Sequence, residues 1–234
     1  QFQIFLFNVI QILLYSKSPL QIAADQGYSE LIQILLNNRK FAEEAFKENT
    51  FYYCENLTKI TIPSFITSIG NGAFKRCTKL ANIKIPSNVT KIGRCCFQLC
   101  TSLTHIEIPS SMTKIDEFLF SECSSLIEVK IPSSITSIGC YAFHNCKNLK
   151  HIDIPPSVAF IDGYTFSECS SLETIEIPTE LTEIVGCMFR GCESLKKVSI
   201  PSSIKKIPRS SFEGCTSLQE ISIPASVVKI GKSV

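Results

Sequence analysis

The sequence predicts a repeat solenoid, a stack of similar coils around one continuous core, preceded by a short helical segment. A pattern of 23 residues recurs seven complete times from Leu57 to Ser217, and a partial unit follows from Leu218 to Val234. The units follow one another without any insertion. One unit is too short to bury its own apolar side, so neighbouring units must stack to form a core.

Each unit opens with apolar residues that predict a short strand. The unit that begins at Leu126 reads LIEVKIPSSITSIGCYAFHNCKN. Its first, fourth and sixth residues are apolar and are expected to point inward, while the residues between them point outward. The proline that follows ends the strand because it has no N–H to donate. We therefore expect parallel strands over 57–62, 80–85 and the equivalent residues of later units.

The second half of each unit predicts a return of the chain to the core. An Ile at the thirteenth position is followed by Gly or Asp in most units, as at Gly70, Gly93, Asp116, Gly139 and Asp162. Gly and Asp tolerate positive φ, so we expect a left-handed turn residue here. Val185 and Pro208 break the pattern, and we expect different turns in their coils. A Phe in every unit, from Phe51 to Phe212, is expected to fill the convex side of the core.

The fixed places of Leu, Ile, Ile-Pro, Ile-Gly, Ala-Phe and Cys in these units resemble the BspA-like subfamily of leucine-rich repeats. The resemblance covers residues 49–234 and implies a right-handed coil of short parallel strands, composed mostly of β and irregular structure. Members of this family commonly engage other proteins or host surfaces. The resemblance therefore implies a binding role but does not name the partner.

Residues 1–48 do not follow the repeat and predict helices. The segment 18–36 resembles an ankyrin repeat, and 39–48 reads as one more short helix. Ser18 is expected to cap a helix that begins at Pro19, with Gln21 completing a capping box and Gly27 ending the helix. We therefore expect an ankyrin-like helical segment or cap over 1–48, and a solenoid over 49–234 that begins with half a coil.

The cysteines follow the repeat instead of forming a disulfide framework. Eight of the 12 occupy one position of the unit: Cys54, Cys77, Cys100, Cys123, Cys146, Cys169, Cys192 and Cys215. No C-x-x-C and no zinc-type Cys/His spacing occurs. Parallel inward-pointing side chains are poorly aimed for disulfide bonds, so we expect free thiols that behave as small buried apolar groups.

Charge and hydropathy exclude two classes of partner. Lys plus Arg number 23 and Asp plus Glu number 21, so nothing favours nucleic acid or an anionic membrane. The apolar opening Gln1–Tyr15 contains polar residues and is shorter than the roughly 20 residues that span a bilayer, so we expect no membrane insertion.

Free thiols and the ankyrin-like segment favour a cytoplasmic location. The family resemblance makes the cell surface the alternative.

Polar residues are spread in rows along the stack, and catalysis requires polar groups that converge. We therefore expect no enzyme activity, no cofactor and no small-molecule substrate. His105, Glu128 and His151 come closest to a site, but their two imidazoles should be roughly 10 Å apart, which is wide for a shared metal. Lys84, Glu107, Lys130 and Asp153 alternate in sign on adjacent strands and are expected to form a ladder of ion pairs.

The pattern favours a non-catalytic protein-protein interaction scaffold that binds its partner through the exposed strand face. A BspA-like cell-surface adhesin or antigen is the alternative. The outward residues of the middle units are the most distinctive, and they predict these binding residues: His105, Glu107, Ile127, Glu128, Lys130, Lys150, His151 and Asp153. Ile127 is the notable one, because an exposed aliphatic residue ringed by charge resembles a small hot spot with a polar rim.

Overall fold

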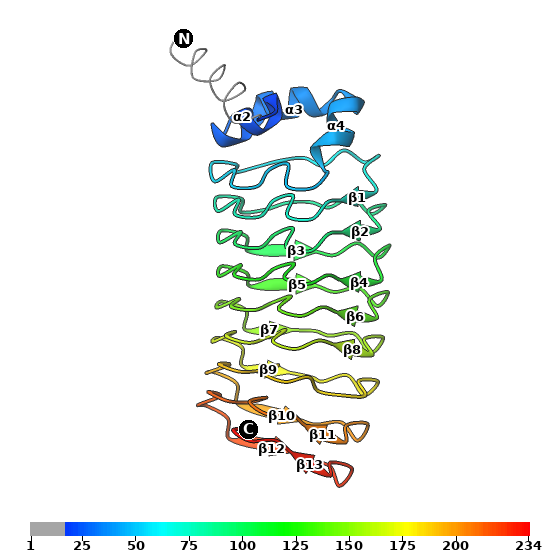
Figure 1. Ribbon diagram of the computed structural model, residues 1–234, viewed down its shortest axis with the longest axis vertical. Helices are drawn as coiled ribbons and strands as arrows, with labels where there is room; N and C mark the ends of the chain where they lie inside the picture. The colour runs from blue at the N-terminus through cyan, green and yellow to red at the C-terminus, as the bar shows by residue number, and fades with distance from the viewer. Residues whose placement is uncertain (1–16) are drawn as a thin grey trace.

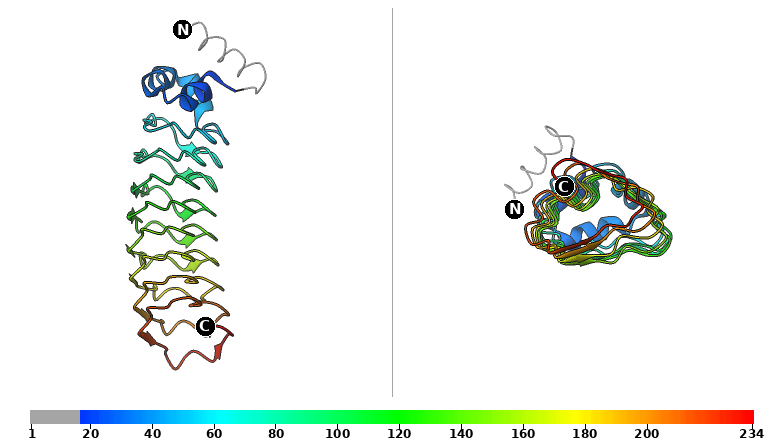
Figure 2. Two further views of the ribbon diagram at one scale, coloured as in Figure 1. Left: turned by 90° about the vertical axis from the view of Figure 1, so that its left-hand side faces the viewer. Right: turned by 90° about the horizontal axis from the view of Figure 1, so that it is seen from below.

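The computed structural model describes residues 17–234, and the apolar opening Gln1–Tyr15 lies outside them. Helices lie at the N-terminal end of the described chain, and the coils stack below them along the long axis (Figure 1). Seen from below, successive coils superimpose on one another (Figure 2). The protein is therefore a parallel β-solenoid, as the repeat predicts. Within residues 17–234, no helix is both long enough and apolar enough to cross a bilayer.

The helices at the N-terminal end are α2 (Pro19–Asp25), α3 (Ser29–Leu36) and α4 (Arg39–Ala45). The predicted capping box of α2 is present. The Ser18 hydroxyl accepts a hydrogen bond from the Gln21 backbone N–H, and the Gln21 side chain accepts one from the Ser18 N–H. Gly27, with a φ of 74°, separates α2 from α3. The Asn38 side chain caps the N-terminus of α4.

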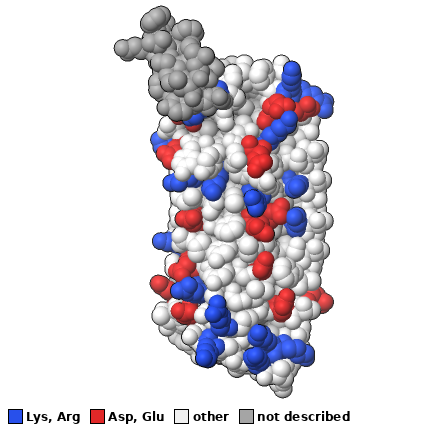
Figure 3. Space-filling view, viewed as in Figure 1, with Lys and Arg blue, Asp and Glu red and all other residues white. Residues whose placement is uncertain are grey.

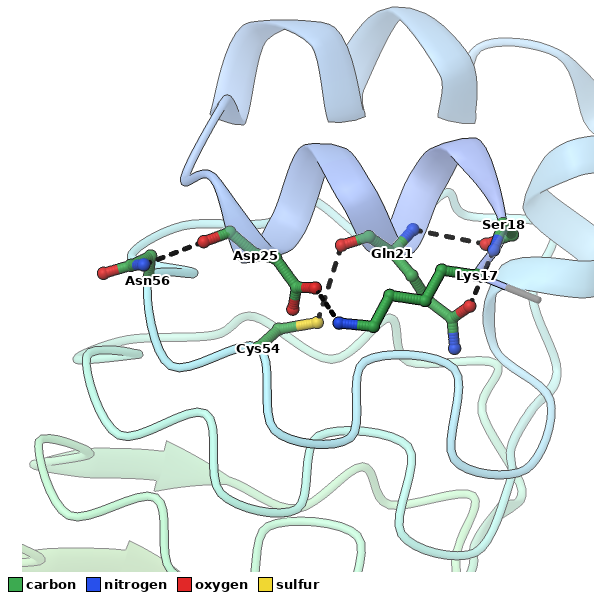
Figure 4. Close-up of polar contacts among 6 residues, drawn as sticks. All are labelled: Lys17, Ser18, Gln21, Asp25, Cys54 and Asn56. Atoms are coloured by element: carbon green, nitrogen blue, oxygen red, sulfur yellow. Dashed lines mark hydrogen bonds and ion pairs between the residues drawn. The ribbon is translucent and has the colours of Figure 1, made fainter. Parts of the chain in front are cut away.

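Polar contacts join α2 to the first turn of the solenoid (Figure 4). The Asn56 side chain donates a hydrogen bond of 2.8 Å to the Asp25 carbonyl. Within the helical segment itself, Lys17 pairs with the Asp25 carboxylate. The Cys54 thiol lies 4.0 Å from the Gln21 carbonyl. The helices and the coils share one buried apolar cluster, to which the helices contribute Leu20, Ala23, Ala24, Ile32, Leu36, Ala42 and Ala45. The helices thus cover the N-terminal end of the solenoid core.

Two parallel ladders follow one another where the sequence predicts strands. The first pairs β3 (His105–Glu107) with β5 (Glu128–Lys130), and the second joins β7 (His151–Ile152), β9 (Thr174–Ile175), β10 (Lys197–Ser199) and β12 (Glu220–Ser222). Paired residues are one repeat apart, as in His105 with Glu128. The strands are shorter than predicted, since they lie within the third to fifth positions of each unit. The coil that begins at Leu57 has no strand here, and the coil that begins at Leu80 has only a bridge from Asn82 to His105.

Three further parallel ladders lie at the twelfth and thirteenth positions, where the sequence predicted only a return to the core. They are β1 (Ser68–Ile69) with β2 (Lys91–Ile92), then β4 (Lys114–Ile115) with β6 (Ser137–Ile138) and β8 (Phe160–Ile161), and then β11 (Lys206–Ile207) with β13 (Lys229–Ile230). The Ile of each pair is buried in all of these strands except β13. Of the two coils with a broken pattern, the one that contains Val185 has no strand at this position, whereas the one that contains Pro208 forms β11 like its neighbours.

The glycines at the fourteenth position do not provide the left-handed turn that the sequence predicted. A positive φ is absent from all three of them, Gly70, Gly93 and Gly139. A Cβ on Gly139 would lie 2.8 Å from the Glu117 backbone nitrogen, so the neighbouring coil approaches too closely for a side chain. The left-handed residues stand at the sixteenth and twentieth positions, as in Tyr141 with a φ of 56° and Asn145 with a φ of 58°.

A row of stacked phenyl rings fills the core. This Phe row is buried throughout and consists of Phe51, Phe74, Phe97, Phe120, Phe143, Phe166, Phe189 and Phe212. Successive ring centroids are 5.2–5.9 Å apart, and successive ring planes lie within 17° of parallel. Because each ring buries a large apolar area, the row is a main source of stability.

The cysteines at the repeated position, here called the Cys row, hydrogen-bond to the Phe row. From Cys77 to Cys215, each thiol donates a bond of 3.1–3.2 Å to the carbonyl of the Phe in the preceding coil. These residues have free thiols. Burial raises the pKa of the Cys123 and Cys169 thiols to about 12. At neutral pH the Cys row is therefore protonated and can donate its hydrogen bonds.

Candidate interaction surface on the strand face

The strand face consists of the outward residues at the second, third and fifth positions of the coils. It carries all eight residues that the sequence predicts to bind a partner, and all eight are exposed. They are His105 and Glu107 on β3, Glu128 and Lys130 on β5, His151 on β7, and Ile127, Lys150 and Asp153 next to β5 and β7. Side chains alternate across a strand, which turns Ile106, Val129 and Ile152 into the core.

An open groove crosses the strand face over the coils that begin at Leu80, Leu103 and Leu126. Its volume is about 720 Å³. The buried residues Ile106 and Ile108 contribute to an apolar floor, and charged side chains stand along the strands that line it. The lining includes four of the predicted residues: His105, Glu107, Glu128 and Lys130. The other four lie outside it: Ile127, Lys150, His151 and Asp153.

The groove also brings in residues that were not predicted as part of the site. Lys84 and Asn82 line it from the coil that begins at Leu80. Lys84 has the same repeat position as Glu107 and Lys130, so the repeat alone is enough to place Lys84 on the strand face. Differences between units single out the middle coils, whereas the groove depends on the shape that three stacked coils form together.

The predicted ion ladder through Lys84, Glu107, Lys130 and Asp153 does not form. Glu107 and Lys130 are opposite each other in the register of β3 and β5. Yet within residues 17–234 no ion pair joins adjacent members of this series. The Asp153 carboxylate lies 2.6 Å from Nε2 of His151 instead. In addition, β5 and β7 are not paired, which interrupts the register that the ladder requires.

The Lys–Glu ion pairs of the strand face lie in the coils nearer the C-terminal end. Lys196 Nζ is 2.7 Å from the Glu173 carboxylate, and Lys197 Nζ is 2.9 Å from Glu220. The hydrogen bond and the charge of Lys196 lower the pKa of Glu173. The charges of the groove differ, because Lys84, Glu107 and Lys130 have no ion-pair partner within the described chain.

The two histidines of the strand face have different neighbours. His105 Nε2 lies 4.0 Å from the Glu128 carboxylate, and His105 Nδ1 lies 3.0 Å from the Thr104 hydroxyl. His151 instead contacts Asp153 and, through Nδ1 at 3.1 Å, the Thr174 hydroxyl. Across the part of the chain that the structure describes, no group of three or more His, Cys, Asp or Glu side chains could hold a metal ion.

A Ser–His contact lies away from the strand face. Nδ1 of His144 is 2.7 Å from the Ser167 hydroxyl, which also donates a hydrogen bond to the Tyr164 carbonyl. Ser167 is 1% exposed, so a substrate could not reach its hydroxyl without local unfolding. This contact therefore stabilises a turn and offers no accessible nucleophile.

Charges of both signs are mixed on the face shown in Figure 3. Blue and red side chains alternate there over a largely uncharged surface, and Lys and Arg gather toward the C-terminal end. The formal net charge of the whole chain is only +2. A partner that is recognised mainly through dense negative charge is therefore not favoured.

The short repeat, the parallel ladders and the inward Leu and Ile positions define a leucine-rich-repeat solenoid. The chain belongs to the family described as BspA type leucine rich repeat region, whose model matches residues 44–173 and 137–234 with 6 copies. This match begins at residue 44, and the ankyrin-like character of the segment before it is not confirmed. No curated protein matches the chain.

Solved structures show the same fold. The leucine rich repeat protein of T. pallidum (TpLRR) is 32% identical with a TM-score of 0.61, over 64% of this chain and 72% of that one. A leucine rich cell surface protein of Faecalibacterium prausnitzii A2-165 is 29% identical with a TM-score of 0.51, over 74% of this chain and 62% of that one. The chain thus spans less than two thirds of the F. prausnitzii protein.

Proposed function

We propose that this chain is a non-catalytic scaffold that binds a protein partner across its strand face. The solenoid over 49–234 supplies the binding surface, and the helical segment within 1–48 covers one end of its core. The groove is the observation that supports this most, because its apolar floor is bordered by Lys84, Glu107 and Lys130, which have no ion-pair partner within residues 17–234. An apolar centre with a polar rim is the usual anatomy of a protein interface.

Ile127 is proposed as the anchor of the interface. Ile127 is 48% exposed. It lies between the buried Leu126 and the charged residue Glu128 of β5, and Lys130 is a second charged residue on the same strand. An aliphatic side chain that becomes buried on binding, surrounded by polar groups that exclude water, is typical of a hot spot. The remaining contact residues are proposed to be His105, Glu107, Glu128, Lys130, Lys150, His151 and Asp153.

Two variants test this proposal with a matched control. The double variant Ile127→Asp/Lys130→Glu changes the strand face, and the control Lys147→Glu/Glu168→Lys changes two exposed residues outside the strand face. Each immobilised protein captures partners from the same protein mixture, and quantitative mass spectrometry compares them with the wild type. A true partner is still captured by the control. Its capture by the strand-face variant falls, because its Kd for that variant rises by more than about tenfold. Melting temperatures should remain nearly unchanged, because all four side chains are on the surface.

Equal loss of binding by the two double variants would place the interface elsewhere. Unchanged binding by Ile127→Asp/Lys130→Glu would show that the strand face is not the binding surface. A large fall in its melting temperature would have to be excluded first, and far-UV circular dichroism with a thermal scan does so for each protein.

A cell-surface adhesin or antigen is the second candidate function. It is favoured by the similarity to the F. prausnitzii protein, which is described as a cell surface protein. The comparisons give no support to the cytoplasmic location that the free thiols favoured. Antibodies raised against residues 49–234 should label intact cells of the source organism if the chain is displayed. Labelling that requires permeabilised cells would contradict a surface role and leave an internal scaffold.

A further inference from the structure

We propose that the groove receives an α-helix of the protein partner, which lies along the solenoid axis. This helix presents an acidic, a basic and an acidic side chain to Lys84, Glu107 and Lys130. The inference rests on the proposed function and specifies the form and charge pattern of the partner at the same site.

The three charges form a line along the stack. Lys84, Glu107 and Lys130 are 23 residues apart and occupy one position in three successive coils. The bridge between Asn82 and His105 and the pairing of β3 with β5 place these coils in register. All three side chains are exposed, and all three line the groove. They therefore present a positive, a negative and a positive charge in that order along the axis.

These charges are available to a partner because the chain itself does not neutralise them. In the coils beyond the groove, Lys197 pairs with Glu220 and Asp153 with His151. In the groove, Glu107 and Lys130 face each other in register, but no ion pair is formed between them in the described chain. A partner that supplies the opposite charges would gain attraction at three neighbouring points without breaking an internal ion pair.

The spacing of the charges favours a helix over an extended strand. Adjacent coils in a parallel ladder are about 4.8 Å apart, so the first and third charges are separated by about 9.6 Å. On one face of a helix, side chains recur every three to four residues, which gives about 5.3 Å per step and about 10.5 Å over two steps. On one face of a strand, two steps of two residues extend about 13 Å. The spacing of side chains on a helix therefore matches the spacing of the coils more closely than the spacing on a strand does.

The apolar floor suits the rest of such a helix. Ile83, Ile85, Ile106 and Ile108 line the groove beneath the three charges. An amphipathic helix could place small apolar residues over this floor while its charged residues reach the rim, as helices do in other grooves. The pattern acidic, basic, acidic reads the same in both directions, so the polarity of the bound helix does not affect the prediction.

Designed peptides test the inference directly. The probe is an alanine-based 18-residue peptide, stapled on one face, with Glu, Lys and Glu at positions i, i+4 and i+7 of the opposite face and Leu at i+3. The first comparison peptide has Lys, Glu and Lys at those positions. The second is an unstapled, proline-containing peptide with Glu, Lys and Glu at i, i+2 and i+4. Fluorescence anisotropy measures each Kd at low salt, where surface charges are least screened.

The wild type should bind the Glu–Lys–Glu helix at least about tenfold more tightly than the Lys–Glu–Lys helix, since three attractive pairs become repulsive. The charge-swapped protein Lys84→Glu/Glu107→Lys/Lys130→Glu should show the reverse preference. Equal affinity for the two helices, a preference that the swap does not reverse, or tighter binding of the extended peptide would overturn the inference. If the swapped protein does not fold, the single variant Glu107→Gln must weaken the preference several-fold.

The outcomes distinguish this inference from the proposed function. If Ile127→Asp/Lys130→Glu abolishes capture of a protein partner while neither helix is preferred, the strand face is the site but the bound element is not this helix. If capture is unaffected and no helix is preferred, the strand face itself is excluded.

Discussion

The Cys146 thiol donates a hydrogen bond of 3.2 Å to the Phe120 carbonyl, 26 residues earlier in the preceding coil. Both residues are fully buried. The same bond recurs from coil to coil, so it links the two buried rows that extend along the solenoid. The thiol therefore contributes both packing volume and a hydrogen bond between coils, which a purely apolar residue of similar size would not provide.

Removing this thiol should destabilise the solenoid. Cys146→Ala loses the hydrogen bond to Phe120 and leaves a small void, and we expect a loss of about 1–2 kcal/mol in the free energy of unfolding. Urea denaturation measures the change. Cys140→Ala is the control, because Cys140 is half-exposed and lies outside the Cys row, and it should change stability by less than about 0.5 kcal/mol. Equal effects of the two variants would mean that the thiol-to-carbonyl bond contributes little.

The buried thiols should also make stability fall at alkaline pH. Burial raises the pKa of Cys123 and Cys169 from an ordinary value of 9.0 to about 12. Below pH 9 both the folded and the unfolded chain hold these protons, so the stabilisation is complete. As pH rises from 9 toward 12, the unfolded thiols ionise while the folded ones remain protonated, so unfolding becomes more favourable.

Urea denaturation between pH 7.5 and pH 10.5 checks this dependence. We expect the slope to reach about 1.4 kcal/mol per pH unit for each thiol that is ionised only in the unfolded state. The double variant Cys123→Ala/Cys169→Ala should lose stability less steeply than the wild type over this range. Parallel curves for the two proteins would show that other groups, such as Lys and Tyr, cause the decline.

The Phe row should be sensitive to truncation. Phe143→Ala removes a fully buried ring that stacks on Phe120 and Phe166 at 5.5 and 5.6 Å, and the cavity should reduce the free energy of unfolding by about 3–5 kcal/mol. Phe160→Ala is the control in the same region, because Phe160 is 41% exposed on β8 and should lose less than about 1 kcal/mol. A loss below about 1 kcal/mol for Phe143→Ala would mean that the row does not support the core.

Two glycines should respond in opposite ways to alanine. A Cβ on Gly139 would lie 2.8 Å from the Glu117 nitrogen, and Gly139→Ala should therefore destabilise by about 1–3 kcal/mol. A Cβ on Gly186 would lie 3.7 Å from its nearest neighbour, the Arg209 carbonyl oxygen. Gly186→Ala should be neutral or stabilising by up to about 1 kcal/mol, because it restricts the unfolded chain. Thermal denaturation of both variants measures the two changes in stability. Equal destabilisation by Gly139→Ala and Gly186→Ala would contradict the prediction.

The repeat made the fold predictable because each of its apolar positions recurs in register. Leu126, Phe143 and Cys146 could be assigned to the core from the sequence, since only a stack of coils buries all three positions in every unit. The capping box at Ser18 and Gln21 was likewise predictable, because it depends on residues three apart in the chain. The outward position of Ile127 followed from its place beside the buried Leu126 and Val129.

Other features depend on distances between coils, which no single unit encodes. Ile138 was expected to return to the core, but its ladder with Ile115 and Ile161 arises only when three coils align their backbones. The pattern predicts a left-handed turn at Gly139, whereas the close approach of Glu117 from the preceding coil explains why this position has no side chain. The separation of Glu107 from Lys130 and the groove beside them depend on side-chain directions and on the joint shape of stacked coils. Local periodicity thus specifies which side of the chain is buried, and packing between coils determines the geometry of the surface that remains exposed.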